Sequence, residues 1–193
     1  ATATATATKT PTQIPTPLLL PTATPSATAE PTVSSRLPVI NVPAGISANT
    51  TFTNGAVYLV SGLTTVYAGV TLQIEPGAVI KFKEGGYYEG RLLVNGVLLA
   101  RGTTARPIIF TSAGDDRYGG DTFMDGGGNW SRPGDWAGLE VGGNSVLDHV
   151  VIAYAGGNGA ALKATGANVD LTNSVVEWSS GDGLHWTNNA GGL

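Results

Sequence analysis

The amino-acid sequence predicts an all-β solenoid in which short strands wind into stacked coils. From Val57 onward, short apolar runs rich in Val, Ile and Leu alternate with turns that contain Gly, Asn or Pro, a pattern typical of β proteins. A second observation is internal repetition, which indicates that one structural unit recurs along the chain. A third is the change in composition after residue 43, which predicts a separate tail at 1–43 and a folded domain at 44–193.

The predicted strands follow one another at short intervals. Their lengths suit β-strands rather than helices, and the helical periodicity is absent. In chain order they are VYLV at 57–60, VTLQI at 70–74, AVIKF at 78–82, RLLV at 91–94, VLLA at 97–100, PIIFT at 107–111 and LEV at 139–141.

The repetition is clearest near the end of the chain. The segment LDHVVIAYAGGNGAAL at 147–162 aligns with LTNSVVEWSSGDGLHW at 171–186, an offset of 24 residues. A looser match sets Ile74 over Val94. The longer alignment places Leu147 over Leu171, Val151 over Val175, His149 over Asn173, Tyr154 over Trp178 and Gly157 over Gly181.

These periods identify the kind of solenoid. Repeats of 20–24 residues with strand-length apolar runs, and without a leucine-rich-repeat signature, predict a parallel β-helix of about five coils. Neighbouring coils then lie about 4.8 Å apart, so that equivalent residues stack in ladders.

Four segments resemble the right-handed parallel β-helix repeat proteins of bacterial surfaces, which share the pectin-lyase-like fold. They are GVTLQIEPGAVIKF at 69–82, LLVNGVLLARGTTARPIIFTS at 92–112, GGDTFMDGGGNWSRPGDWAGLEV at 119–141 and SVLDHVVIAYAG at 145–156. The resemblance covers about residues 55–193. It implies a right-handed winding and an extracellular, carbohydrate-rich location, and it implies little about activity.

Composition excludes several classes of protein. The net charge of −4 is small and dispersed, so we expect no nucleic-acid partner. The absence of Cys excludes disulfides and thiolate metal sites. No apolar run is long enough to predict a membrane span.

The tail at 1–43 holds eight of the eleven prolines and should be extended. We expect Ile14, Leu18, Leu19 and Leu20 to lie against another surface, because a solvated linker does not need them. Thr- and Pro-rich stalks are common O-glycan acceptors. The candidate sites are Thr2, Thr4, Thr6, Thr8, Thr10, Thr12, Thr16, Thr22, Thr24 and Thr28.

Residues 114–135 interrupt the repeat and predict a Gly- and Asp-rich loop extruded from one coil. Asp121 and Asp125 are spaced four apart with a Gly after the second, which makes them candidate calcium ligands. Phe123 occupies the position of a middle ligand, so the match to a calcium loop is incomplete. No other cofactor is predicted.

The sequence assigns no catalytic residue. Glycoside hydrolysis requires two carboxyl groups on one surface, and we expect the carboxylates of the repeats to serve in separate turns. Lys163 is the only Lys or Arg in the last two coils, with no cluster expected around it. His149 is interpreted as a stacked corner residue. The carboxylates considered are Asp148, Asp170, Glu177 and Asp182.

Two functions remain open. The first is an extracellular structural protein that assembles head to tail into a surface filament, because Leu184 and Trp186 lie in a final coil that no cap is expected to cover. Its partners would be copies of itself. The alternative is a carbohydrate-binding or polysaccharide-active β-helix module on a Thr/Pro linker, in which exposed aromatic residues stack on sugars.

Overall fold

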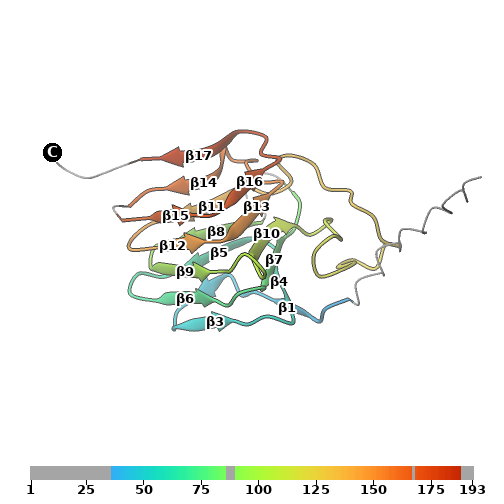
Figure 1. Cartoon of the computed structure of the whole chain (residues 1–193), viewed down its shortest axis with the longest axis horizontal. Coiled ribbons are helices and arrows are strands. Elements are labelled where there is room, and N and C mark those ends of the chain that lie inside the picture. Colours follow the sequence, from blue (N-terminus) through green and yellow to red (C-terminus); the bar gives the residue numbers. More distant parts are fainter. Residues whose placement is uncertain (1–35, 86–89, 167, 188–193) are drawn as a thin grey trace, which may run out of the picture. The chain divides into compact units, whose positions relative to one another are not determined.

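A computed structural model describes residues 36–85, 90–166 and 168–187 and confirms the parallel β-helix (Figure 1). The secondary structure of these residues consists of strands only. Successive strands pass from one sheet to the next, and each pairs in parallel with the equivalent strand of the coil before it. The described residues form five coils of three strands and two strands of a sixth.

The coils build three parallel sheets, which we call sheets A, B and C. Sheet A contains β1 (Val39–Asn41), β4 (Val57–Val60), β7 (Val79–Phe82), β10 (Ile108–Ser112), β13 (Val150–Ala153) and β16 (Val175–Glu177). Sheet B contains β2 (Gly45–Ile46), β5 (Leu63–Val66), β8 (Arg91–Val94), β11 (Gly138–Val141), β14 (Ala160–Ala164) and β17 (Asp182–Trp186). Sheet C contains β3 (Thr50–Phe52), β6 (Thr71–Ile74), β9 (Val97–Arg101), β12 (Val146–Asp148) and β15 (Asp170–Thr172).

The β-helix begins earlier than the composition suggested. Strand β1 lies inside the range assigned to the tail, and its residues pair with Val57, Tyr58 and Leu59 of β4. Pro38 and Pro43, on either side of the strand, give this segment the composition of the tail. Pro38 precedes the strand, a position that proline tolerates, and its carbonyl accepts a hydrogen bond from the Val57 N–H at 2.9 Å.

The 24-residue offset holds for only part of the last repeat. Leu147 pairs with Leu171, and Val151 pairs with Val175, as predicted. Sheet B differs, because Leu162 pairs with Leu184, an offset of 22. The corner between β16 and β17 is two residues shorter than the corner between β13 and β14.

Two of the predicted alignments are therefore wrong. Gly181 stacks on Gly159 rather than on Gly157, and a Cβ atom added to Gly181 would lie 2.3 Å from the Gly159 carbonyl oxygen. Ile74 pairs with Ala100 rather than with Val94, because a long connection between β7 and β8 lengthens that coil.

The interior is filled by apolar side chains, and Trp136 is the largest of them that is fully buried. Its indole lies 3.9 Å from the Phe82 ring, centroid to centroid, with the two planes 3° apart. The indole N–H donates a 2.8 Å hydrogen bond to the Ala153 carbonyl. Trp136 therefore connects the end of the inserted loop to the coils on both sides of it.

The inserted loop leaves β10 at Ser112 and rejoins the coil at β11, and it covers the outer face of sheet A. Beneath it, Val57, Val79 and Ile109 form a buried outward-facing ladder, against which Tyr118 packs. An amide N–H of Asn129 donates to the Tyr154 hydroxyl at 2.8 Å. The loop is thus packed against the solenoid rather than simply extruded from it.

Lys81 of β7 joins the inserted loop to sheet A by hydrogen bonds. Its side chain is fully buried, and its ammonium group donates to the Gly120 carbonyl at 2.8 Å and to the Thr122 hydroxyl at 2.7 Å. Burial lowers the pKa of Lys81, and the nearby loop carboxylates oppose that effect.

The core position of Trp136 gives a first prediction. Trp136→Ala should lower the free energy of unfolding by about 3–5 kcal/mol, because a large buried side chain is replaced by a cavity. Urea denaturation followed by circular dichroism measures the change. Trp130→Ala is the matched control: Trp130 is 69% exposed in the same loop, and its loss should cost no more than about 0.5 kcal/mol. Equal losses in the two variants would contradict the prediction.

Candidate functional site

Charged side chains form a ladder on the outer face of sheet B. Glu140 of β11 pairs with Lys163 of β14, and Lys163 pairs with His185 of β17. All three alternate with inward residues such as Leu139 and Leu162, which are buried in the core. In-register stacking therefore brings residues that are 23 and 22 positions apart in the sequence to the same point of adjacent coils.

Glu140 lies between two cations. An Arg91 N–H group donates to Glu140 Oε2, and Lys163 Nζ is 3.7 Å from Glu140 Oε1. Glu140 is 19% exposed, whereas Lys163 is 44% exposed. At the outer end of the ladder, His185 Nδ1 lies 3.6 Å from Asp182 Oδ2.

An open hollow of about 310 Å³ adjoins this ladder. Its walls offer an ammonium group, an imidazole, a carboxylate and a carboxamide, so hydrogen-bond donors and acceptors face the same space. The lining residues are Asn158, Gly159, Ala160, Lys163, Asp182 and His185.

The ladder suits binding better than bond cleavage. Glu140 is already occupied by Arg91 and Lys163, which leaves it poorly placed to transfer a proton to a substrate. Hydrolysis of a glycosidic bond uses two carboxyl groups that flank it. The outer carboxylate of this face, that of Asp182, is 69% exposed and lies at the edge of the hollow.

A second cluster lies in the inserted loop. Asp121 and Asp125, the predicted calcium ligands, are joined by Asp116, and their carboxylate oxygens lie within 4.8 Å of one another. Gly126 N–H donates to Asp121 at 3.1 Å, and Gly128 N–H donates to Asp116 at 2.8 Å. The loop backbone thus fixes the carboxylates of Asp116 and Asp121, and the Asp125 N–H donates to Asp121 as well.

The local environment moves two of these pKa values in opposite directions. Burial raises the pKa of Asp116, and the charges of Asp121 and Asp125 raise it further. Burial also acts to raise the pKa of Asp121, but backbone N–H groups of residues 124–127 outweigh it and lower that pKa. A bound cation would relieve the repulsion between the carboxylates, which is the arrangement that calcium uses.

Asp115 takes no part in this cluster. It is fully buried and accepts a 2.7 Å hydrogen bond from the Thr111 hydroxyl. The Arg117 guanidinium binds both of its carboxylate oxygens, at 2.8 Å and 3.0 Å. Its role is to fix the start of the loop.

The other acidic residues considered from the sequence are dispersed. Asp148 and Asp170 belong to sheet C, Glu177 to sheet A and Asp182 to sheet B. Lys163, which seemed isolated, instead faces Glu140. The repeat alignment missed this contact because it did not extend back to β11.

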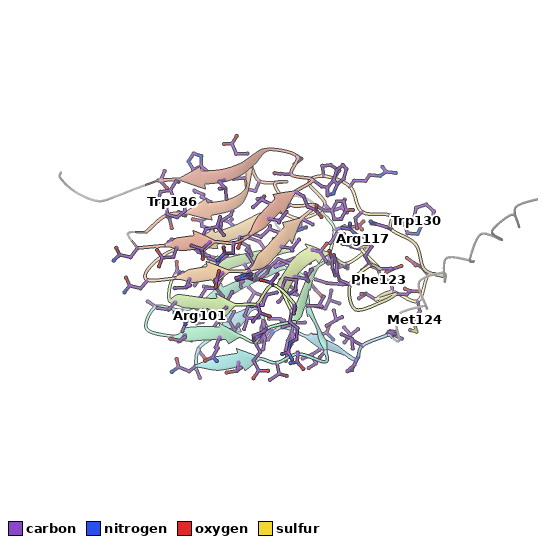
Figure 2. The ribbon with its side chains drawn as sticks, in the orientation of Figure 1. Arg101, Arg117, Phe123, Met124, Trp130 and Trp186 are labelled. Carbon is purple, nitrogen blue, oxygen red and sulfur yellow. The ribbon has the colours of Figure 1, made fainter. Side chains whose placement is uncertain are left out.

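Among the described residues, the exposed aromatic side chains do not gather on one face. Trp178 stacks on Tyr154 with ring centroids 6.4 Å apart, whereas Trp186 pairs in register with the buried Ala164. Figure 2 shows Trp130, Phe123 and Met124 on the inserted loop, on the opposite side of the view from Trp186.

The predicted assembly residues fall into two groups. Leu184 and Trp186 continue the inward ladders of β14, and each is 48% exposed. Ile14, Leu18, Leu19 and Leu20, like the ten threonines that are candidate O-glycan sites, lie outside the described residues.

Comparison with known proteins shows the family. A family model of the pectate-lyase-like β-helix domain matches residues 44–174, more than half of the chain. The chain therefore belongs to the pectate-lyase-like β-helix family. No curated protein and no solved structure matched the chain in these comparisons. In the described residues we find no helix with the length and apolarity that crossing a bilayer requires.

The calcium site stays a prediction, and it can be tested by thermal unfolding. If calcium binds only the folded chain, it should raise the free energy of unfolding by about 2.7 kcal/mol at 100 times the dissociation constant. Asp121→Asn should abolish the shift, whereas Asp170→Asn, in sheet C, should retain it. Superimposable unfolding curves of the parent chain in calcium and in a chelator would contradict the prediction.

Proposed function

We propose that this β-helix is an extracellular module that binds a neutral, linear polysaccharide along the outer face of sheet B without cleaving its glycosidic bonds. The observation that carries the proposal is the ladder Glu140–Lys163–His185 beside an open hollow. Membership of the pectate-lyase-like family supports a polysaccharide-related role.

The direction of the ladder supports a linear ligand. Its rungs belong to consecutive coils, so they follow the axis of the solenoid in steps of about 4.8 Å. A chain molecule lying along that axis would meet a polar side chain at each coil, whereas a compact ligand would contact only one or two of them.

The charge of the face supports a neutral ligand. The two positive charges of Arg91 and Lys163 are balanced by the two negative charges of Glu140 and of Asp182, which lies at the edge. Sugar hydroxyl groups both donate and accept hydrogen bonds, so they match this mixture. A strongly anionic polymer would gain no net electrostatic attraction from a face whose charges cancel.

Family membership also supports an extracellular location, since domains of this kind are commonly found on secreted or surface proteins. A Thr- and Pro-rich segment at 1–43 fits a surface stalk. Protease accessibility on intact cells would test the location.

Head-to-tail assembly stays a second proposal. Leu184 and Trp186 present half-exposed apolar surface in register with buried residues of β14, and stacking of another coil would bury it. Leu184→Glu should then reduce any concentration-dependent sedimentation of the purified chain. A sedimentation profile that does not change with concentration would count against assembly.

Binding can be measured by isothermal titration calorimetry against neutral glucans, mannans and xylans, with polygalacturonate as the anionic comparison. We expect one neutral polymer to bind and Lys163→Gln to weaken it about fivefold, the equivalent of about 1 kcal/mol for one hydrogen bond. Arg101→Gln is the control, because it removes the same charge from sheet C. Absence of binding to every neutral polymer, or equal weakening by both variants, would overturn the proposal.

A further inference from the structure

A rigid turn projects one threonine beside His149. Residues Thr103 and Arg106 close the turn with two backbone hydrogen bonds of 3.1 Å and 3.0 Å. The Arg106 guanidinium donates to the Pro76 carbonyl at 2.7 Å and anchors the turn to the coil below. Thr104 lies at the exposed tip.

Gly102 brings this turn against the corner that joins β12 to β13. Its N–H group donates to the Asp148 carbonyl at 2.8 Å. A Cβ atom at Gly102 would lie 2.4 Å from the His149 carbonyl oxygen, so only glycine permits this approach. The turn and the corner are thereby held in fixed contact.

The contact places three polar side chains in a row. Thr104 Oγ1 lies 3.1 Å from His149 Nε2, and His149 Nδ1 lies 3.0 Å from Asp148 Oδ1. The second contact is not aligned as a hydrogen bond, and Nδ1 is shielded from solvent. Catalytic hydrogen bonds are often poorly aligned before substrate binds.

Asp148 is held in its ionised form. Its carboxylate accepts hydrogen bonds from Asn173 at 2.8 Å and from Thr172 at 2.9 Å. These two bonds, together with the neighbouring His149, lower the pKa of Asp148. A fixed negative charge therefore lies beside the imidazole nitrogen that faces away from Thr104.

His149 adopts the left-handed backbone conformation, in which Asn is more common than His. Its φ is 50°, and Asn173, at the equivalent corner of the next coil, has the same φ. Asn is among the residues that tolerate this left-handed conformation best. The chain therefore uses the expected Asn at one corner and an imidazole at the other, where the turn bearing Thr104 meets it.

We propose that Thr104, His149 and Asp148 form a site that hydrolyses esters of small acyl groups, such as O-acetyl esters. Thr104 is the nucleophile, His149 is the general base and Asp148 is a positioning residue that stabilises the imidazolium. The array is independent of the sheet B face, and it adds a chemical role to the corner at His149, for which the sequence predicted only stacking.

The reaction balances without a further reagent. Thr104 Oγ attacks the ester carbonyl while its proton passes to His149 Nε2. The bond from the carbonyl carbon to the alkoxy oxygen then breaks, and His149 returns the proton to the departing alcohol. Water, deprotonated by the same imidazole, attacks the acyl-threonine, which releases the carboxylic acid and restores the hydroxyl group.

The experiment uses p-nitrophenyl acetate with the full chain. Thr104→Val and His149→Asn should each lower the rate of p-nitrophenol release by about 100-fold, the lower end of what a general base contributes. Thr104→Ser should retain activity. Thr51→Val, a change at an exposed threonine of β3 in sheet C, should leave the rate unchanged.

Two further measurements separate chemistry from folding. His149→Asn should unfold at the parent temperature, because Asn173 already occupies the equivalent conformation. Peptide mapping of the quenched parent should locate an acetyl group on Thr104. Parent-level rates in Thr104→Val and His149→Asn, or acetyl groups on lysines alone, would overturn the proposal.

Discussion

In-register stacking of parallel strands is the constraint on which the rest of this structure depends. Each coil repeats the backbone path of the one before it, so the inward side chains of neighbouring coils stack on one another and form one core that is mostly apolar. The same rule acts on the outside, where it aligns the charged ladder of sheet B and the buried ladder beneath the inserted loop. Core and candidate sites therefore have a common geometric origin.

The sequence predicted the winding because two coils near the end resemble each other residue by residue, and Leu147 does stack on Leu171. It could not predict the register elsewhere, because the corners between strands differ in length from coil to coil. The corner after β16 is two residues shorter than the corner after β13, and the connection after β7 is several residues longer than the connection after β4. A fixed period cannot represent such changes.

In the candidate sites, too, the sequence predicted contacts between residues that are close along the chain, but not contacts that depend on strand register or on the path of the loop. Asp121 and Asp125 are close in sequence, so their proximity was predictable, and Asp116 joins them only through the path of the loop. Glu140 and Lys163 meet because of sheet register, which no local motif reports. The burial of Lys81 was equally hidden, because it results from the loop folding back over sheet A.

The inserted loop enters and leaves without changing the frame of the solenoid. Ser112 still pairs with Phe82 before it, and Gly138 still pairs with Arg91 after it. The coils are thus a scaffold that tolerates the inserted loop, and a loop of another length or composition could be placed at the same position without changing the strand register. Two requirements on the loop are fixed: it must cover Val57, Val79 and Ile109 on sheet A, and its final segment must place the Trp136 indole in the interior of the solenoid.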